Sequence, residues 1–263
     1  MDTTESPEAR EGARRPGRLP LAWRLLRGLG WTMIWLGIFL LGFVGHQLWI
    51  TDFFAERHQA VLAEERDEYF ATVEIVEVPY TPGSTTPTTL PSDPGATTTT
   101  TTIPDPSPGD APLLLRVEQP PERSTAFAEI RIPEIDVEWT IVEGVRLADL
   151  KNGAGHMPDT PLPGQPGNAV ISGHRTTYGA PFHDLDKLEA GDRIEVETGL
   201  GTHVYEVTEW IIVEPTALWV TDPRDGAWLT LTTCHPKFSA RQRLVLFAQL
   251  AAGPNAEVIL GSS

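Results

Sequence analysis

The stretch Leu229–Leu246, LTLTTCHPKFSARQRLVL, decides how the rest of the chain is interpreted. It contains the only cysteine of the 263 residues, Cys234, at the end of an alternating run of apolar residues and threonines that begins at Trp228. This alternation predicts a strand, and residues 235–240 after it predict a loop. A second strand is predicted over Leu244–Leu250. The thiol therefore stands where one strand ends and near the start of the next, which suits chemistry better than core packing.

Three further side chains could act with this thiol. His174 follows the predicted strand Ala169–Ser172 beside a glycine, so its imidazole can reach over a neighbouring strand end. Arg241 and Arg243 precede the strand after Cys234, and because they share one parity, alternation does not choose between them. A neighbouring base or cation favours the nucleophilic thiolate, and an arginine can hold a carbonyl or an oxyanion. The combination predicts a catalytic site, whereas each residue alone is better explained as a buried cysteine, a surface histidine or an ion-pair partner.

The other titratable residues do not extend this site. His235 adjoins Cys234, but neighbouring side chains of an extended chain point to opposite sides, so it is a poor base for the thiol. The remaining histidines lack the spacing of zinc ligands and are interpreted as structural or solvated. The net charge of −16 argues against general nucleic-acid binding. We therefore propose no metal site, no cofactor and no nucleic-acid partner.

The N-terminal region predicts a membrane anchor. An arginine-rich segment, residues 1–27, precedes an uncharged run from Gly28 to Ile50. At ~1.5 Å per residue this run spans roughly 35 Å, enough to cross a bilayer, and it is longer than the apolar part of a cleavable signal peptide. Because the arginines precede the run and acidic residues follow it, the N-terminus is predicted to be cytoplasmic and the rest extracellular.

The remainder divides by composition. Residues 51–80 are predicted to form a juxtamembrane segment, and the Thr- and Pro-rich residues 81–112 a disordered linker that holds the next domain off the membrane. Residues 113–252 have the composition of one compact domain in which many short alternating segments are separated by turn signals. This pattern favours a mostly β fold, a closed barrel or a sandwich with brief helices. Residues 253–263 are a C-terminal tail.

The residues around the candidate site resemble those of sortases, the membrane-anchored cysteine transpeptidases of Gram-positive cell envelopes. Thr230–Cys234 reads TLTTC, which is similar to the TLxTC signature of that family. Ser172–Phe182, SGHRTTYGAPF, looks like the segment around the family's catalytic histidine, particularly in the actinobacterial class E branch. Arg243 falls where the family's catalytic arginine stands, so the resemblance makes the choice that parity leaves open.

The resemblance implies a closed eight-stranded sortase-type β-barrel with short helices, preceded by one transmembrane helix. It assigns catalytic roles to His174, Cys234 and Arg243. It also makes four neighbouring residues candidates for substrate binding: Thr232, Thr233, Arg175 and Tyr178. His235 and Phe238 depart from the asparagine and tyrosine that are common in class E, which bears on substrate preference rather than on the type of reaction.

A transpeptidase of this kind cleaves a C-terminal LAxTG- or LPxTG-like sorting signal between Thr and Gly and passes the thioacyl group to an amine. The implied partners are secreted proteins that carry such a signal, a peptidoglycan precursor or a protein amine as acceptor, and the membrane. Two alternatives stay open at this point. One is a cysteine hydrolase that releases its substrate to water, and the other is a non-catalytic surface β-barrel scaffold in which Cys234 is buried.

Overall fold

A computed structural model describes residues 21–81 and 113–261. The chain divides into two compact units, Met1–Gln47 and Leu48–Ser263. The first twenty residues of the predicted arginine-rich tail and residues 82–112 of the predicted linker lie outside the described residues, so both expectations remain untested.

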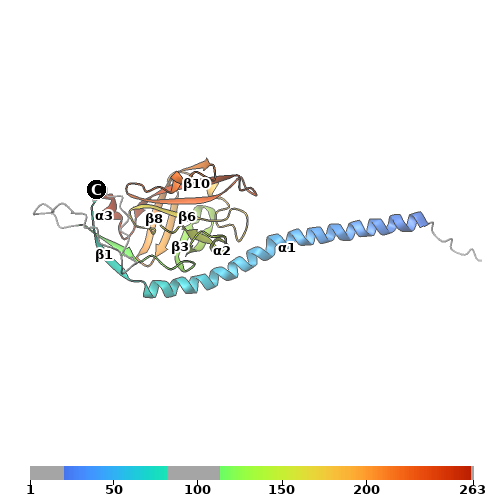
Figure 1. Ribbon diagram of the computed structural model, residues 1–263, viewed down its shortest axis with the longest axis horizontal. Coiled ribbons are helices and arrows are strands. Elements are labelled where there is room, and N and C mark those ends of the chain that lie inside the picture. Colours follow the sequence, from blue (N-terminus) through green and yellow to red (C-terminus); the bar gives the residue numbers. More distant parts are fainter. Residues whose placement is uncertain (1–20, 82–112, 262–263) are drawn as a thin grey trace, which may run out of the picture. The chain divides into compact units, whose positions relative to one another are not determined.

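Helix α1, Leu21–Thr72, contains a segment that is long and apolar enough to cross a membrane. This candidate span is Ala22–His46, with a mean hydropathy of 1.7, and none of its most apolar window is buried inside the protein. A helix that is apolar on every side presents no polar face to water, which suits a lipid environment. The predicted run from Gly28 to Ile50 is therefore one part of a helix that begins earlier and ends later (Figure 1).

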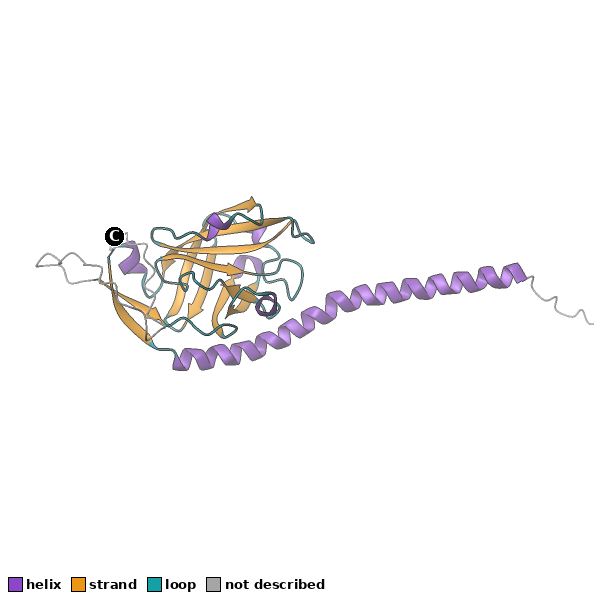
Figure 2. Ribbon diagram, in the orientation of Figure 1, coloured by secondary structure: helices purple, strands orange, loops and turns teal. Residues whose placement is uncertain are grey.

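Eight strands among the described residues form a closed barrel in the order β10-β8-β7-β3-β4-β5-β6-β9. Figure 2 draws the strands in orange. Neighbouring strands are antiparallel except for the pairs β4–β5 and β6–β9. The barrel strands are β3 (Ala126–Ile132), β4 (Val137–Glu143), β5 (Ala154–His156), β6 (Gly167–Ser172), β7 (Arg193–Thr198), β8 (Gly201–Val213), β9 (Ala227–His235) and β10 (Gln242–Ala252). The predicted mostly β, closed eight-stranded fold is confirmed.

The helices after α1 are short. They are η1 (Pro133–Ile135), α2 (Leu147–Leu150), η2 (Leu185–Lys187), η3 (Leu218–Thr221) and α3 (Ala256–Leu260). Each lies in or after a connection between strands, so the barrel and not the helices fixes the relative positions of distant residues.

Alternation along β9 divides its residues between two faces. Leu229 and Leu231 are buried in the main core cluster, together with Leu244 and Leu246 of β10. Since successive side chains of a strand point to opposite faces, the residues of even number in β9, up to Cys234, lie on the outer face of the barrel wall. The nucleophile predicted from the sequence is therefore on the side of the strand that faces away from the core.

The second half of α1 packs on the barrel. Leu62 is buried against Ala126 and Val142. Gln59 Nε2 donates a 2.6 Å hydrogen bond to the Asn152 carbonyl, and Gln59 Oε1 accepts one of 2.8 Å from the backbone N–H of Thr140. Each of these bonds satisfies a backbone group of the barrel or its connections and contributes about 1 kcal/mol to the free energy of unfolding.

The strands on either side of the predicted linker pair with each other. β1 (Ile75–Tyr80) and β2 (Leu113–Glu118) form an antiparallel two-stranded sheet with Ile75 opposite Glu118 and Tyr80 opposite Leu113. From the sequence, residues 51–80 are predicted to be separate from the domain that begins at residue 113. In the structure, both belong to the unit Leu48–Ser263. Composition missed this because the partner of β1 comes after a 32-residue segment that carries no pairing pattern.

A buried polar cluster lies at the barrel end away from Cys234. The hydroxyl of Thr198 donates a short hydrogen bond to Glu118, whose Oε1 also accepts a 2.8 Å bond from the Leu200 N–H. The same hydroxyl lies 3.2 Å from His203 Nε2, and His203 is fully buried. Burial lowers the pKa of His203 to about 4, because the charged imidazolium loses its hydration there.

Candidate active site

Cys234 and Arg243 are directly opposite each other on neighbouring strands. The register of β9 with β10 pairs Cys234 with Arg243, and the register of β10 with β8 pairs Arg243 with Val213. Directly opposed residues have their Cβ atoms about 5 Å apart on one face of the sheet. Arg241 precedes β10 and is exposed. The strand register thus brings one of the two predicted arginines beside the thiol and leaves the other outside the sheet.

The side chain of Arg243 is anchored at one nitrogen. Nη1 donates 3.0 Å hydrogen bonds to the carbonyls of Ala240, in the loop before β10, and of Gln242, the first residue of β10. Within residues 21–81 and 113–261, the Nε and Nη2 atoms of Arg243 make no hydrogen bond. These donors can therefore serve a carbonyl oxygen placed over Cys234.

Side-chain hydrogen bonds join the strand end that carries His174 to the strand end that carries Cys234. β6 and β9 are parallel neighbours with Ser172 opposite Thr232, and the two hydroxyl oxygens are 2.7 Å apart. Thr233, whose side chain is buried on the opposite face, donates a 2.8 Å hydrogen bond to the carbonyl of Gly173. The residue before the nucleophile is thereby bonded to the residue before the histidine.

Gly173 shapes the backbone that leads into His174. A Cβ at this position would stand 2.6 Å from the ring of Phe182, which is fully buried. The Phe182 N–H also donates a 3.1 Å hydrogen bond to the His174 carbonyl. A side chain at residue 173 would thus displace a core aromatic ring, and glycine is required for this close approach.

His174 has a polar atom without a protein partner. Its Nε2 is buried and has no hydrogen bond among the described residues, while the imidazole ring lies 5.0 Å from the ring of Tyr178. Burial lowers the pKa of His174, because the imidazolium form is desolvated. Buried polar atoms are normally hydrogen-bonded, so this unpaired ring nitrogen next to the strand that carries Cys234 calls for a functional explanation.

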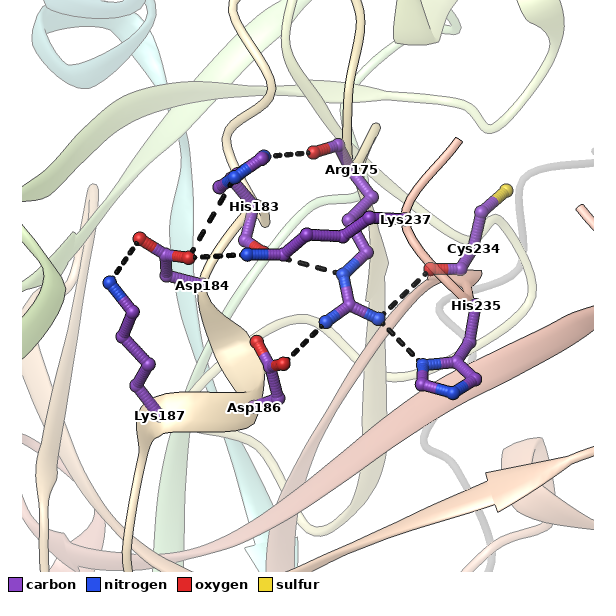
Figure 3. A network of polar contacts seen from close by, with 8 residues as sticks. All are labelled: Arg175, His183, Asp184, Asp186, Lys187, Cys234, His235 and Lys237. Atoms are coloured by element: carbon purple, nitrogen blue, oxygen red, sulfur yellow. Dashed lines mark hydrogen bonds and ion pairs between the residues drawn. The ribbon is translucent and has the colours of Figure 1, made fainter. Parts of the chain in front are cut away.

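Arg175 lies under the site and not on its surface. The residue is 2% exposed, and its guanidinium bonds the carbonyl of Cys234, the ring of His235 and the carboxylate of Asp186. Figure 3 shows the thiol of Cys234 pointing away from this network and from the imidazole of His235. The expectation that these two neighbouring side chains point apart agrees with the geometry.

The remaining predicted site residues occupy different positions. Thr232 shares the outer face with Cys234, whereas Thr233 is buried beneath it. Tyr178 adopts a left-handed backbone conformation with φ of 53° and lies against His174. Substrate contact by Thr232, Thr233, Arg175 and Tyr178 stays a prediction. The part played by Asp186 was missed, because a carboxylate in an acidic loop gives no sequence signal of a buried partner.

The chain is similar in sequence to proteins of one family. Residues 130–251 match the sortase domain model. Sortase SrtE1 of Streptomyces coelicolor is 27% identical over 254 residues, which cover 90% of this chain and 60% of that protein. Sortase D of Bacillus subtilis is 36% identical over 118 residues, covering 44% of this chain and 58% of that protein. The solved structure of sortase E from Streptomyces avermitilis is 35% identical with a TM-score of 0.47, covering 50% of this chain and 91% of that one.

The barrel and its strand-end residues thus form a sortase domain, and the chain belongs to the sortase family. Its resemblance to class E agrees with the match to SrtE1 along most of the chain. The chain spans about 60% of the length of SrtE1 and of sortase D.

Proposed function

We propose that this protein is a membrane-anchored cysteine transpeptidase that cleaves a C-terminal LAxTG- or LPxTG-like sorting signal between Thr and Gly. The observation that carries the proposal is the strand register, which sets Arg243 opposite Cys234 on the outer face of β9 and β10. The unpaired Nε2 of His174 at the end of the adjacent strand β6 supplies the third group.

The reaction has two acyl-transfer steps. In the first, the Cys234 thiolate attacks the threonine carbonyl, a sulfur–carbon bond forms, and the carbon–nitrogen bond to glycine breaks. Protonated His174 gives its proton to the leaving amine, so the imidazole ends this step neutral. In the second, an acceptor amine attacks the thioester, His174 takes a proton from the amine nitrogen, and the thiolate leaves. Arg243 donates hydrogen bonds to the oxyanion in both steps.

The electrostatics of His174 limit the reactive population. Because burial lowers the pKa of the imidazole, the imidazolium is the minor form at neutral pH unless the thiolate of Cys234 stabilises it. The proton that His174 gives to the leaving amine therefore comes from this minor form.

The candidate span in α1 supports membrane attachment. The arginines that precede this span favour a cytoplasmic N-terminus, which leaves the sortase domain outside the cell. Secreted proteins that carry the sorting signal are then the substrates, and a peptidoglycan precursor or a protein amine is the acceptor.

The proposal is tested with the full chain in detergent micelles. The protein is incubated with an LAxTG peptide or an LPxTG peptide and an excess of a glycine- or lysine-type amine, and the products are identified by mass spectrometry. We expect a ligated product joined through threonine, absent with Cys234→Ala. Cleavage without ligation by any amine indicates a hydrolase, and no cleavage of either peptide contradicts the proposal.

A further inference from the structure

Arg175 is buried, and its guanidinium contacts groups from several segments of the chain. Its Nη1 lies 2.8 Å from Nδ1 of His235 and 3.4 Å from the carbonyl oxygen of Cys234, and its Nη2 lies 2.8 Å from Asp186 Oδ2. Its Nε donates a 3.3 Å bond to the carbonyl of His183. One planar guanidinium thus joins three segments of chain: the residues after β6, the segment that enters η2, and the end of β9.

The network is reciprocal between Arg175 and His183. The backbone carbonyl of Arg175 lies 2.7 Å from Nδ1 of His183, which donates to it, while the side chain of Arg175 donates back to the His183 carbonyl. Both the main chain and the side chain of Arg175 are fixed as a result. Figure 3 shows the guanidinium at the centre of these partners.

A lysine could not replace these contacts. The guanidinium presents donors in a rigid planar fork, whereas an ammonium group is a compact charge on a flexible stem. Nδ1 of His235 must accept the hydrogen bond from Arg175, so a neutral His235 carries its proton on Nε2. Arg175 thus holds the His235 side chain through Nδ1, its acceptor nitrogen.

A second link between the same segments is weaker. Lys237, in the loop after Cys234, and Lys187 each lie 2.8 Å from Asp184, and all three side chains are between 27% and 65% exposed. Exposed ion pairs contribute little, so the buried guanidinium is the principal connection. Because His174 immediately precedes Arg175, any movement of this connection displaces the imidazole relative to the thiol.

We propose that Arg175 is a positioning residue that fixes the end of β9 against the segment after His174, and so sets the separation of the Cys234 thiol and the imidazole. The inference rests on the proposed transpeptidase function for its kinetic consequence, but not for its structural one. In this role Arg175 acts through His174 and Cys234, because its guanidinium is buried among protein partners and the Cys234 thiol points away from it.

The kinetic test compares Arg175→Lys with the matched control Lys237→Gln in the full chain in detergent. Since small misplacements of reacting groups cost up to about a hundredfold in rate, we expect kcat of Arg175→Lys to fall by about tenfold or more. KM should stay within about twofold, and Lys237→Gln should stay within about twofold in both constants. A rise in KM at unchanged kcat indicates substrate contact, and wild-type constants likewise overturn the proposal.

The structural test needs no substrate. Amide hydrogen exchange, read by mass spectrometry, should accelerate in residues 174–186 and 234–242 of Arg175→Lys, while the rest of the barrel strands keep their protection. If the wild-type protein ligates no peptide, the proposed function fails, and the exchange experiment still decides whether Arg175 joins the two segments. Unchanged exchange in both segments contradicts the inference.

His235→Phe provides a variant that keeps Arg175. It preserves a ring but removes the Nδ1 acceptor. We therefore expect kcat to fall and exchange to accelerate as in Arg175→Lys, but by smaller amounts. If Arg175→Lys does not fold, this variant decides the matter, and exchange and kcat equal to those of the wild type overturn the proposal.

Discussion

The hydrogen bond from Thr233 to Gly173 offers a direct test of how the site is assembled. Thr233→Val replaces the hydroxyl by a methyl group of similar size and leaves the Gly173 carbonyl without the 2.8 Å bond that it accepts in a buried position. An unsatisfied buried group of this kind costs about 1–3 kcal/mol. For a domain of this size that lowers Tm by roughly 2–4 °C per kcal/mol.

Thr230→Val is the matched control. Thr230 is also buried in β9 and donates a 2.6 Å hydrogen bond to Asn168 on β6, but it lies farther from the nucleophile. Both variants should lose similar stability in thermal unfolding. Only Thr233→Val should also lose turnover, by about tenfold or more, since it loosens the strand ends that carry the thiol and the imidazole. Equal turnover in the two variants would refute this reasoning.

Three further predictions concern the site, the buried histidine and the packed helix. Arg243→Lys should lower kcat/KM by about 10²–10³ with an unchanged circular dichroism spectrum, whereas Arg241→Lys should stay within about twofold; equal losses would contradict the assignment from register. The folded-state pKa of His203, about 4, lies below its ordinary value, so the free energy of unfolding should fall by about 3 kcal/mol from this group as the pH drops from about 6.5 to 4. In urea unfolding, His203→Asn should lack this contribution. The same pH dependence in the variant and the wild type would contradict the prediction. Leu62→Ala, which empties a site against Ala126 and Val142, should lower the free energy of unfolding by about 2–4 kcal/mol, and an unchanged urea midpoint would show that α1 does not pack there.

The mostly β fold could be predicted from alternating segments between turn signals, which left a barrel and a sandwich open, whereas the closed eight-stranded barrel followed from the family resemblance. β9 and β10 also carry the pattern that separates the core residues Leu229 and Leu244 from the outer face. β5 gave no such signal, because it has three residues, one of them a glycine, and is defined by its neighbours. The pairing of β1 with β2 was hidden for a different reason, since strand partners across a long insertion have no local pattern.

The site could be predicted only in part. The end of a strand and the residue types pointed to Cys234 and His174, but parity left Arg241 and Arg243 equivalent. The family resemblance chose Arg243, and the register of β9 and β10 sets this residue opposite Cys234. The role of Arg175 was also beyond the sequence. Its partners at residues 183–186 and 234–235 are brought together by the packing of the segment at η2 against the end of β9, and no alternation or spacing encodes such a contact.

If Cys234 is the nucleophile of an acyl transfer, the intact mass of the protein should reveal a thioacyl adduct. The full chain is mixed with an LAxTG or LPxTG peptide without an acceptor amine and quenched in acid. We expect a mass increase equal to the peptide up to its threonine, removed by hydroxylamine and absent in Cys234→Ala. Peptide cleavage without any such adduct, or an adduct that persists in Cys234→Ala, would show that Cys234 is not the nucleophile.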